Sequence, residues 1–346
     1  MNYYRYLVKK GIQFDFICMY GELAYQSEII KLGGKIYFTS NVKKRPWKFH
    51  REFEEILGKN HYEIVYVNML SAANIVPLKI SYRQGVSRII AHSHNTMAPG
   101  RIRNFLHKKN MPAVKKYATD YWACGKEAAV WLFGENSLDE TVIIQNAIPT
   151  EKFLFQDTVR QKKRSELGIC HNTLVLGHIG RMEEQKNHQF LLKIFRAVLS
   201  KQENAVLILI GDGKLKEKLK QQAHLLDIEE KVLFLGRRND VNLLLSAMDI
   251  FVFPSLYEGL SVTAVEAQCA GLPCIVSEGL TEDTVIMECF WRFSLEKTPG
   301  EWAEKILEIE KNLHNISDND KIRKRMIEMG FDIQTEAERV YQLLCG

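Results

Sequence analysis

The chain has 346 residues, of which 46% are hydrophobic and 26% are charged, with a formal net charge of +5. This composition excludes a disordered or fibrous protein, and the length favours two α/β domains over one. The seven cysteines include no Cys-x-x-Cys pair, and no apolar run reaches the roughly 18 residues of a membrane-spanning helix, so we expect no disulfide framework, no zinc site, no transmembrane segment and a cytoplasmic location.

Short β-rich runs alternate with helical patterns through the first half of the chain. This alternation is typical of βα units wound around a parallel sheet. Strands are predicted at 14–18, 35–39, 64–68, 88–93, 121–124 and 142–145, with helices between them, for instance at 47–57 and 126–133.

The pattern restarts after Pro149, which predicts a second complete domain. Strands are expected at 174–179, 205–210, 232–235, 250–254 and 274–276, and helices near 188–200, 215–226, 241–248 and 261–270. The last forty or so residues are predicted to form helices with no strand between them. We therefore predict an N-terminal domain at 1–149, a C-terminal domain at 150–325 and a final helix at 326–346 that crosses back to the first domain.

Charge is distributed unevenly between the two halves. Residues 1–150 hold 21 basic against 12 acidic side chains, a net charge of +9, so the remaining residues carry −4. A basic first half suits an anionic partner, such as a phosphorylated acceptor or a lipid headgroup surface. A solvated basic face without a partner explains the same charges equally well.

Two carboxylates, Glu258 and Glu266, lie eight positions apart directly after the predicted buried strand 250–254. If a helix begins near Ser261, the N–H groups of Leu260, Ser261 and Val262 point outward at its positive end, where a diphosphate can bind. Glu266, about one turn inside, can then accept hydrogen bonds from a ribose. The spacing alone is common, but a buried strand before it and the turn 270–273 after it make it more specific.

At this point the chain resembles the family 4 retaining glycosyltransferases, which include many capsule and exopolysaccharide enzymes. The resemblance rests on the segment 253–259 and its continuation through Glu266 to Pro273. It implies an α/β protein of the GT-B fold, with two Rossmann-like doubly wound domains facing a central cleft. It also implies that Gly259, Leu260, Ser261 and Glu266 bind the donor and that Glu258 is catalytic.

A second segment that matches the family is 177–187, where a strand leads through a glycine turn towards a helix. Arg181 and Lys186 are expected at the carboxyl end of that strand. Sugar transfer leaves a nucleoside diphosphate whose charge rises as the glycosidic bond breaks, so two fixed cations there lower the barrier. Without the neighbouring motif, each of these two cations would be interpreted as an ordinary surface charge.

The run Ile210-Gly211-Asp212-Gly213 ends the next strand, and the resemblance implies that Gly211 lets the nucleotide approach the backbone. A Gly-x-Gly pair is weak evidence by itself, and the third glycine of a dinucleotide motif is absent, which disfavours nicotinamide binding. By the same resemblance, Arg237 is a donor contact near the base.

In the first half, His92 and His94 end a strand on the same side, because alternate strand residues share a face. The pair could hold a metal, but no third ligand of suitable spacing follows. The resemblance implies instead that His94 faces the donor sugar and is catalytic, with His92 as the alternative. We expect no metal and no cofactor, since the nucleotide sugar is a substrate.

The start of the chain departs from the family pattern. Family members open with a buried strand and a glycine-rich loop, whereas Met1–Arg5 looks like the end of the first helix. That strand would lie near the middle of the first sheet, where its neighbours need its backbone groups. We therefore expect a truncated or misassigned start and a form that is unstable or poorly active. A smaller departure is Ala147, where the family more often has Gly.

The resemblance implies transfer of a sugar, with retention, from a nucleoside-diphosphate donor, with UDP-sugars expected, to a lipid-linked or saccharide acceptor in capsule or exopolysaccharide synthesis. Two basic clusters suit the diphosphate of a polyprenyl-linked saccharide and peripheral contact with the inner face of the membrane. No nucleic-acid-binding motif accompanies them. The clusters are the segment 43–51 and a set formed by Arg101, Arg103, Lys108, Lys109, Lys115 and Lys116.

Two other functions remain open at the level of the sequence. A sugar-nucleotide epimerase or a phosphorylase could share the tandem architecture. A non-catalytic partner subunit of a glycosyltransferase would fit the missing first strand.

Overall fold

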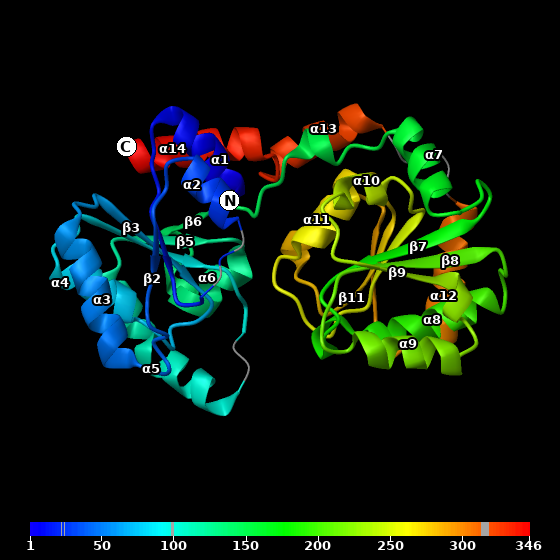
Figure 1. Cartoon of the computed structure of the whole chain (residues 1–346), viewed down its shortest axis with the longest axis horizontal. Coiled ribbons are helices and arrows are strands. Elements are labelled where there is room, and N and C mark those ends of the chain that lie inside the picture. The colour runs from blue at the N-terminus through cyan, green and yellow to red at the C-terminus, as the bar shows by residue number, and fades with distance from the viewer. Residues whose placement is uncertain (22, 24, 98–99, 313–317) are drawn as a thin grey trace. The chain divides into compact units, whose positions relative to one another are not determined.

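The computed structural model describes residues 1–346 except 22, 24, 98–99 and 313–317. Its described residues form two compact units, which Figure 1 shows in the colours of the chain. One unit comprises Met1–Ala147 together with Ile333–Gly346, and the other comprises Ile148–Asp332. Each is an α/β unit with parallel sheets.

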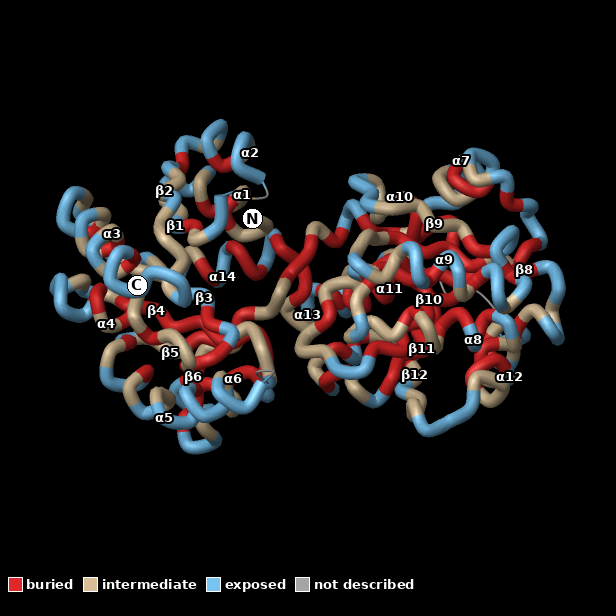
Figure 2. Tube along the Cα trace, turned by 60° about the horizontal axis from the view of Figure 1, so that its bottom comes forward, coloured by how far each residue is buried: buried red, intermediate tan, exposed pale blue. Residues whose placement is uncertain are grey.

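The second unit contains one continuous parallel sheet in the order β12-β11-β10-β7-β8-β9. Every residue of β7, β10 and β11 is buried, as expected for strands covered by helices on both faces (Figure 2). The strands are β7 (Leu174–Ile179), β8 (Ala205–Ile210), β9 (Val232–Gly236), β10 (Ile250–Phe253), β11 (Cys274–Ser277) and β12 (Phe290–Phe293).

Helices cover the two faces of this sheet as two separate hydrophobic layers. One layer centres on Leu191, Phe195 and Trp302 and the other on Phe251 and Val265. The first includes α8 (His188–Leu199), α9 (Lys216–Leu225) and α12 (Pro299–Lys311), and the second includes α10 (Val241–Leu245), α11 (Val262–Cys269) and α13 (Asn319–Glu328); α7 (Asp157–Glu166) contacts α10. In α8 the buried residues recur at helical spacing, which is why the sequence predicts this helix well.

The first unit has a divided sheet. Strands β3 (Ile64–Met69), β4 (Arg88–Ser93), β5 (Asp120–Ala123) and β6 (Thr141–Ile143) pair in chain order, whereas β1 (Phe16–Cys18) pairs only with β2 (Ile36–Phe38). The two parts are in contact with each other. Tyr62, which precedes β3, donates a hydrogen bond of 2.7 Å from its hydroxyl to the carboxylate of Asp15, which precedes β1. The strands of this unit therefore form two separate parallel sheets.

The helices of the first unit pack on both sides of these strands. Phe49, Phe53 and Ile80 form one small core, and Leu7, Trp122 and Val340 form part of another. The helices are α1 (Asn2–Leu7), α2 (Gln26–Lys31), α3 (Pro46–Lys59), α4 (Val76–Arg83), α5 (Arg101–Tyr117), α6 (Lys126–Phe133) and α14 (Ile333–Cys345), the last of which packs on α1.

Three details differ from the sequence-based expectations. Strand β12 was not predicted, because its four residues include Arg292 and form too short an apolar run. The end of the second unit lies at Asp332 rather than 325, since α13 continues to Glu328 and Phe331 is buried in that unit's core. In the basic segment 43–51, Phe49 is buried, which leaves Trp47 as its exposed aromatic residue.

No helix among the described residues is long and apolar enough to cross a bilayer.

Candidate functional site

Three loops that follow β7, β8 and β9 lie side by side at the carboxyl ends of these strands. The N–H of Gly180 donates to the Ile210 carbonyl at 2.9 Å, and the N–H of Gly211 donates to the Gly236 carbonyl at 2.8 Å. Gly211 has a φ of +137°, and a Cβ there would lie 2.0 Å from the Gly180 carbonyl oxygen. Only glycine therefore allows this close approach, which exposes backbone to a ligand at the edge where doubly wound sheets bind ligands.

Lys186 and Glu258 form an ion pair at the same edge. The Lys186 Nζ lies 2.7 Å from the Glu258 Oε1, and the two side chains are only 16% and 10% exposed. Gln185 joins them, because its Nε2 donates to the Glu258 Oε1 at 3.2 Å while its carbonyl accepts from the Leu256 N–H at 2.8 Å. Two segments predicted to act together, 177–187 and 253–266, are thus brought into direct contact.

The other two predicted cations stand apart from this pair. Arg181 is in contact with Glu183 at 3.4 Å, and its side chain is 74% exposed. Arg237, directly after β9, is also exposed. Both follow strands of the second unit at their carboxyl ends.

The amino end of α11 follows the Glu258 loop. Ser261 is its N-cap, and its hydroxyl accepts a hydrogen bond from the Ala264 N–H at 3.4 Å. Among the described residues, no protein acceptor is found for the N–H groups of Leu260 and Val262. Gly259 and Leu260 are half-buried. These groups form the kind of helix terminus at which a diphosphate binds.

Glu266 lies in the second turn of α11, and it is half-buried. Burial raises the pKa of its carboxyl to about 7. Near neutral pH the group is therefore poised between its acid and carboxylate forms. Hydrogen bonds donated by a ligand hydroxyl would favour the carboxylate.

Two buried histidines beside the Lys186 ion pair were missed by the sequence analysis. The Phe253 ring centroid is 4.6 Å from the Lys186 Nζ and 5.1 Å from the His178 ring, which in turn contacts the His188 ring at 4.5 Å. Burial lowers the pKa of His188 to about 4 and that of His178 well below its usual value. Both imidazoles are neutral at pH 7 and add no charge beside Lys186. The only sequence signal for these two neutral neighbours of Lys186 is that each histidine lies in an apolar segment, His178 in β7 and His188 in α8.

In the first unit, the rings of the two histidines at the end of β4 lie close together, with centroids 4.0 Å apart and planes tilted by 33°. The His94 Nε2 is 2.7 Å from the Asn68 Oδ1 at the end of β3, and the His92 Nδ1 is hydrogen-bonded to the Tyr66 hydroxyl. Burial lowers the pKa of His94 to about 4. His94 is therefore a neutral hydrogen-bonding group, and Asn68 and Tyr66 are neighbours that the sequence analysis did not single out.

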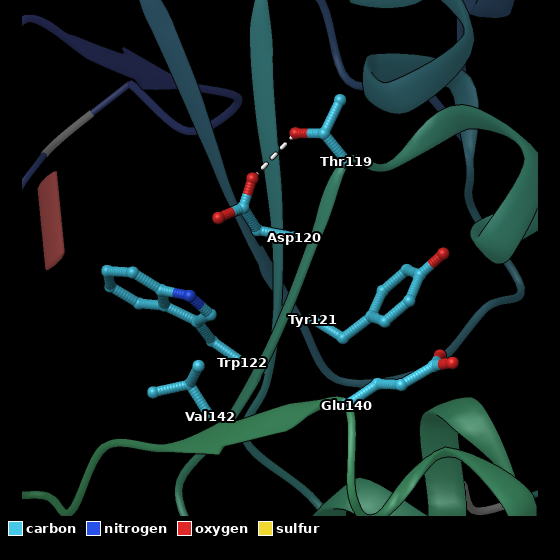
Figure 3. A pocket seen from close by; sticks show the side chains of 6 residues that line it. All are labelled: Thr119, Asp120, Tyr121, Trp122, Glu140 and Val142. Carbon is cyan, nitrogen blue, oxygen red and sulfur yellow. Dashed lines mark hydrogen bonds between the residues drawn. The ribbon is translucent and has the colours of Figure 1, made fainter. Parts of the chain in front are cut away.

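A hollow of about 340 Å³ in the first unit lies away from these residues. Figure 3 shows its lining from the starts of β5 and β6, where the Thr119 hydroxyl donates to the Asp120 carboxylate. Asp120 is also paired with Arg88 at 2.7 Å. The hollow is at the amino ends of the strands, so it is not at the edge where a doubly wound sheet binds its ligand.

Within the ranges that the structure describes, no group of three or more His, Cys, Asp or Glu side chains is arranged to hold a metal ion. The predicted catalytic residues His94 and Glu258 belong to different units.

Residues 159–331 match the family described as Glycosyl transferases group 1. The putative glycosyltransferase EpsF of Bacillus subtilis is 32% identical to the chain over 316 residues, which cover 88% of this chain and 82% of that protein. An Escherichia coli protein, UDP-Gal:alpha-D-GlcNAc-diphosphoundecaprenol alpha-1,3-galactosyltransferase, is 32% identical over 157 residues, covering 44% of this chain and 41% of that enzyme.

Among solved structures, HepE of Anabaena in complex with UDP matches with a TM-score of 0.80 at 18% identity, covering 99% of this chain and 96% of that chain. At that identity the likeness concerns the fold, which is GT-B with two Rossmann-like domains. The chain belongs to the group 1 glycosyltransferase family and is a glycosyltransferase of the GT-B fold.

Proposed function

We propose that the chain is a family 4 retaining glycosyltransferase that transfers a sugar from a UDP-sugar to a lipid-linked saccharide in exopolysaccharide or capsule synthesis. The observation that carries the proposal is the Lys186–Glu258 ion pair at the carboxyl edge of the sheet. Glu258 lies in the loop that leads to the amino end of α11. The names of EpsF and of the E. coli galactosyltransferase support this reaction class.

The diphosphate of the donor binds at the amino end of α11, beside Gly259, Leu260 and Ser261, where the N–H groups of Leu260 and Val262 have no protein acceptor among the described residues. Lys186 and Arg181 stabilise the negative charge that grows on the departing diphosphate, which lowers the barrier more than it stabilises the bound donor. Gly211 and Arg237 contact the nucleotide, and Glu266 in its carboxylate form accepts hydrogen bonds from the ribose.

Glu258 orients the sugar and stabilises positive charge at its anomeric carbon. The acceptor attacks from the face that the nucleotide leaves, so no protein nucleophile is needed. His94 contributes as a neutral hydrogen-bonding group to the sugar, because its low pKa leaves it uncharged at physiological pH. Asn68 holds the His94 ring in place through the 2.7 Å contact. No metal takes part in this scheme.

For the acceptor we propose a saccharide carried on a polyprenyl diphosphate, and with it peripheral contact at the inner face of the cell membrane. The E. coli relative is named for a diphosphoundecaprenol-linked acceptor. The excess of basic side chains in residues 1–150 supports an anionic partner on the first unit.

A thermal-shift panel of UDP, ADP and GDP and their sugars tests the donor, because a ligand that binds the native state raises the melting temperature with its concentration. UDP and one UDP-sugar should stabilise the protein most. The selected UDP-sugar should then be consumed only when a polyprenyl-diphosphate saccharide is present.

Three outcomes would contradict the proposal. Preference for GDP or ADP would exclude the UDP-sugar. Conversion of the donor to an isomer without any acceptor would favour an epimerase. Neither binding nor transfer by the purified chain would favour a non-catalytic partner subunit.

A further inference from the structure

Helix α5 (Arg101–Tyr117) carries an unusual concentration of positive charge. It contains six basic side chains and no acidic one, and all six are exposed or half-buried. Among the described residues, none of the six forms an ion pair with a carboxylate. The basic residues are Arg101, Arg103, Lys108, Lys109, Lys115 and Lys116.

The first two turns of the same helix expose large apolar side chains to solvent. Ile102 is 79% exposed, Phe105 is 66% exposed and Leu106 is 38% exposed. These three residues and Lys109 stand at positions i, i+3, i+4 and i+7, which lie on one face of a helix. The exposed apolar residues therefore form a single strip with a cation at its end.

Packing on another side of the helix fixes which face is turned outward. The His107 ring stacks on the Trp131 ring with centroids 3.9 Å apart, and its Nδ1 accepts the Ala72 N–H at 3.0 Å. His107 and Val114, seven residues apart, are both buried. Since rotation of α5 would break these contacts, the strip of Ile102, Phe105 and Leu106 stays exposed. In Figure 1, α5 lies at the lower rim of its unit, and Figure 2 shows much of its surface as exposed.

An apolar strip bordered by cations matches the boundary of an anionic bilayer, where acyl chains lie directly below negatively charged headgroups. A globular protein partner would fit the apolar strip, but it would need a strongly acidic rim to match six unpaired cations. The helix is too short and too charged to cross the membrane, which leaves a position in the plane of the interface.

We propose that the first half of α5 binds the surface of an anionic lipid bilayer, with Ile102, Phe105 and Leu106 below the headgroups and Arg101, Lys108 and Lys109 at the lipid phosphates. The biological purpose of this binding rests on the proposed function, because an acceptor carried on a membrane lipid is located at such a surface. The binding itself requires neither donor nor acceptor, so it can be measured separately.

Sedimentation of the full chain with vesicles tests the proposal. Vesicles of phosphatidylcholine with about one third phosphatidylglycerol should bind the protein, and vesicles of phosphatidylcholine alone should bind it much less. The double variants I102S/F105S and K108E/K109E should each weaken binding by about tenfold or more. The residual binding of I102S/F105S should be abolished by salt, since only its electrostatic part remains.

Matched controls come from α9 (Lys216–Leu225) of the second unit. Leu225 is 84% exposed, and Lys218 and Lys220 are exposed on the same helix. The variants L225S and K218E/K220E should bind vesicles as the unchanged protein does. A fluorescence reporter adds a direct test of insertion: the fluorescence that Phe105→Trp adds to that of the five native tryptophans should be quenched by brominated lipid, and the fluorescence that Leu225→Trp adds should not.

Equal binding to both kinds of vesicle, undiminished binding by I102S/F105S, or no quenching at position 105 would overturn the proposal. If the unchanged protein transfers sugar but does not bind anionic vesicles, this inference fails and the proposed function stands. If it binds vesicles through α5 but transfers no sugar, the inference stands and the proposed function fails.

Discussion

The two units contain similar apolar strands but bury them to different degrees. All six residues of β7 in the second unit are buried, whereas in β3 of the first unit only Met69 is. The difference follows from neighbours: β7 pairs with β8 and β10, while β3 pairs with β4 alone. In β1, Ile17 is 37% exposed for the same reason. An apolar strand becomes core only when strands or helices cover both its edges and its faces.

The comparison extends to the functional residues. In the second unit the segments 177–187 and 253–266 are held together by an ion pair and backbone hydrogen bonds on a continuous sheet. In the first unit His94 is held by Asn68, a residue at the end of the half-exposed strand β3. We therefore expect donor binding to be the more robust property of this chain.

The largest expected effect comes from breaking the ion pair. Glu258→Ala and Lys186→Ala should each reduce sugar transfer by a factor of about 100 to 1,000, because each removes a charge aimed at the transition state. The melting temperature should also fall in both variants, because each leaves the other charge of a pair that is only 16% and 10% exposed without its partner, so rates are compared at a temperature where all variants are folded. Initial rates with the UDP-sugar selected in the thermal-shift panel measure this.

The control is Lys201→Ala. Its ion pair with Glu304 has the same 2.7 Å separation but is exposed, and both residues lie outside the site segments 177–187 and 253–266. Transfer rates within twofold of each other for all three variants would remove Lys186 and Glu258 from the mechanism.

The next effect concerns the backbone of the second unit. Gly211→Ala should lower the free energy of unfolding by about 3 kcal/mol and abolish stabilisation by UDP, because the new Cβ meets the Gly180 carbonyl. Gly236→Ala is the matched control: it also has a positive φ, of +66°, but no atom lies within 4 Å of its Cβ position. It should cost about 1 kcal/mol. Urea unfolding curves compare the two, and equal losses would mean that the close approach of the loops does not matter.

Hydrogen exchange tests the comparison of the sheets directly. Amides of β1 and β3 should exchange at least about 30-fold faster than those of β7 and β8, because strands with an open edge unfold locally at lower cost. Within the first unit, β5 is paired on both sides and should be as protected as β8. Mass spectrometry of peptic peptides resolves these segments. Uniform protection across both sheets would show that the open edges do not weaken the first unit.

A smaller effect concerns Glu266. Its pKa of about 7 means that the free protein loses the carboxylate as the pH falls through 7. Affinity for the UDP-sugar should therefore decline about tenfold per pH unit below this point and level off above it. A UDP-sugar is the right ligand because its phosphates do not titrate in this range. Glu266→Gln should give an affinity that is independent of pH from 5.5 to 8.5, measured by titration calorimetry; a slope that survives in this variant would assign the titration to another group.

Much of the fold could be predicted from local patterns. The strands at 174–179, 205–210 and 88–93 have the bounds expected from their apolar runs, and the N-cap Ser261 is where the loop-to-helix junction was expected. Strand β12 and the extent of α13 were missed, because a four-residue strand containing Arg292 and a mostly polar helix carry weak periodic signals.

The sequence by itself determined the α/β class, the two-unit order and the segments that hold Lys186 and Glu258, because periodicity and residue type act over a few neighbouring positions. Tertiary structure alone decided the division of the first sheet, the neutral pair of His178 and His188 beside Lys186, and the outward rotation of α5. These features depend on which edges, rings and faces meet across long stretches of chain. Burial and pairing are properties of such contacts, and no local pattern encodes them.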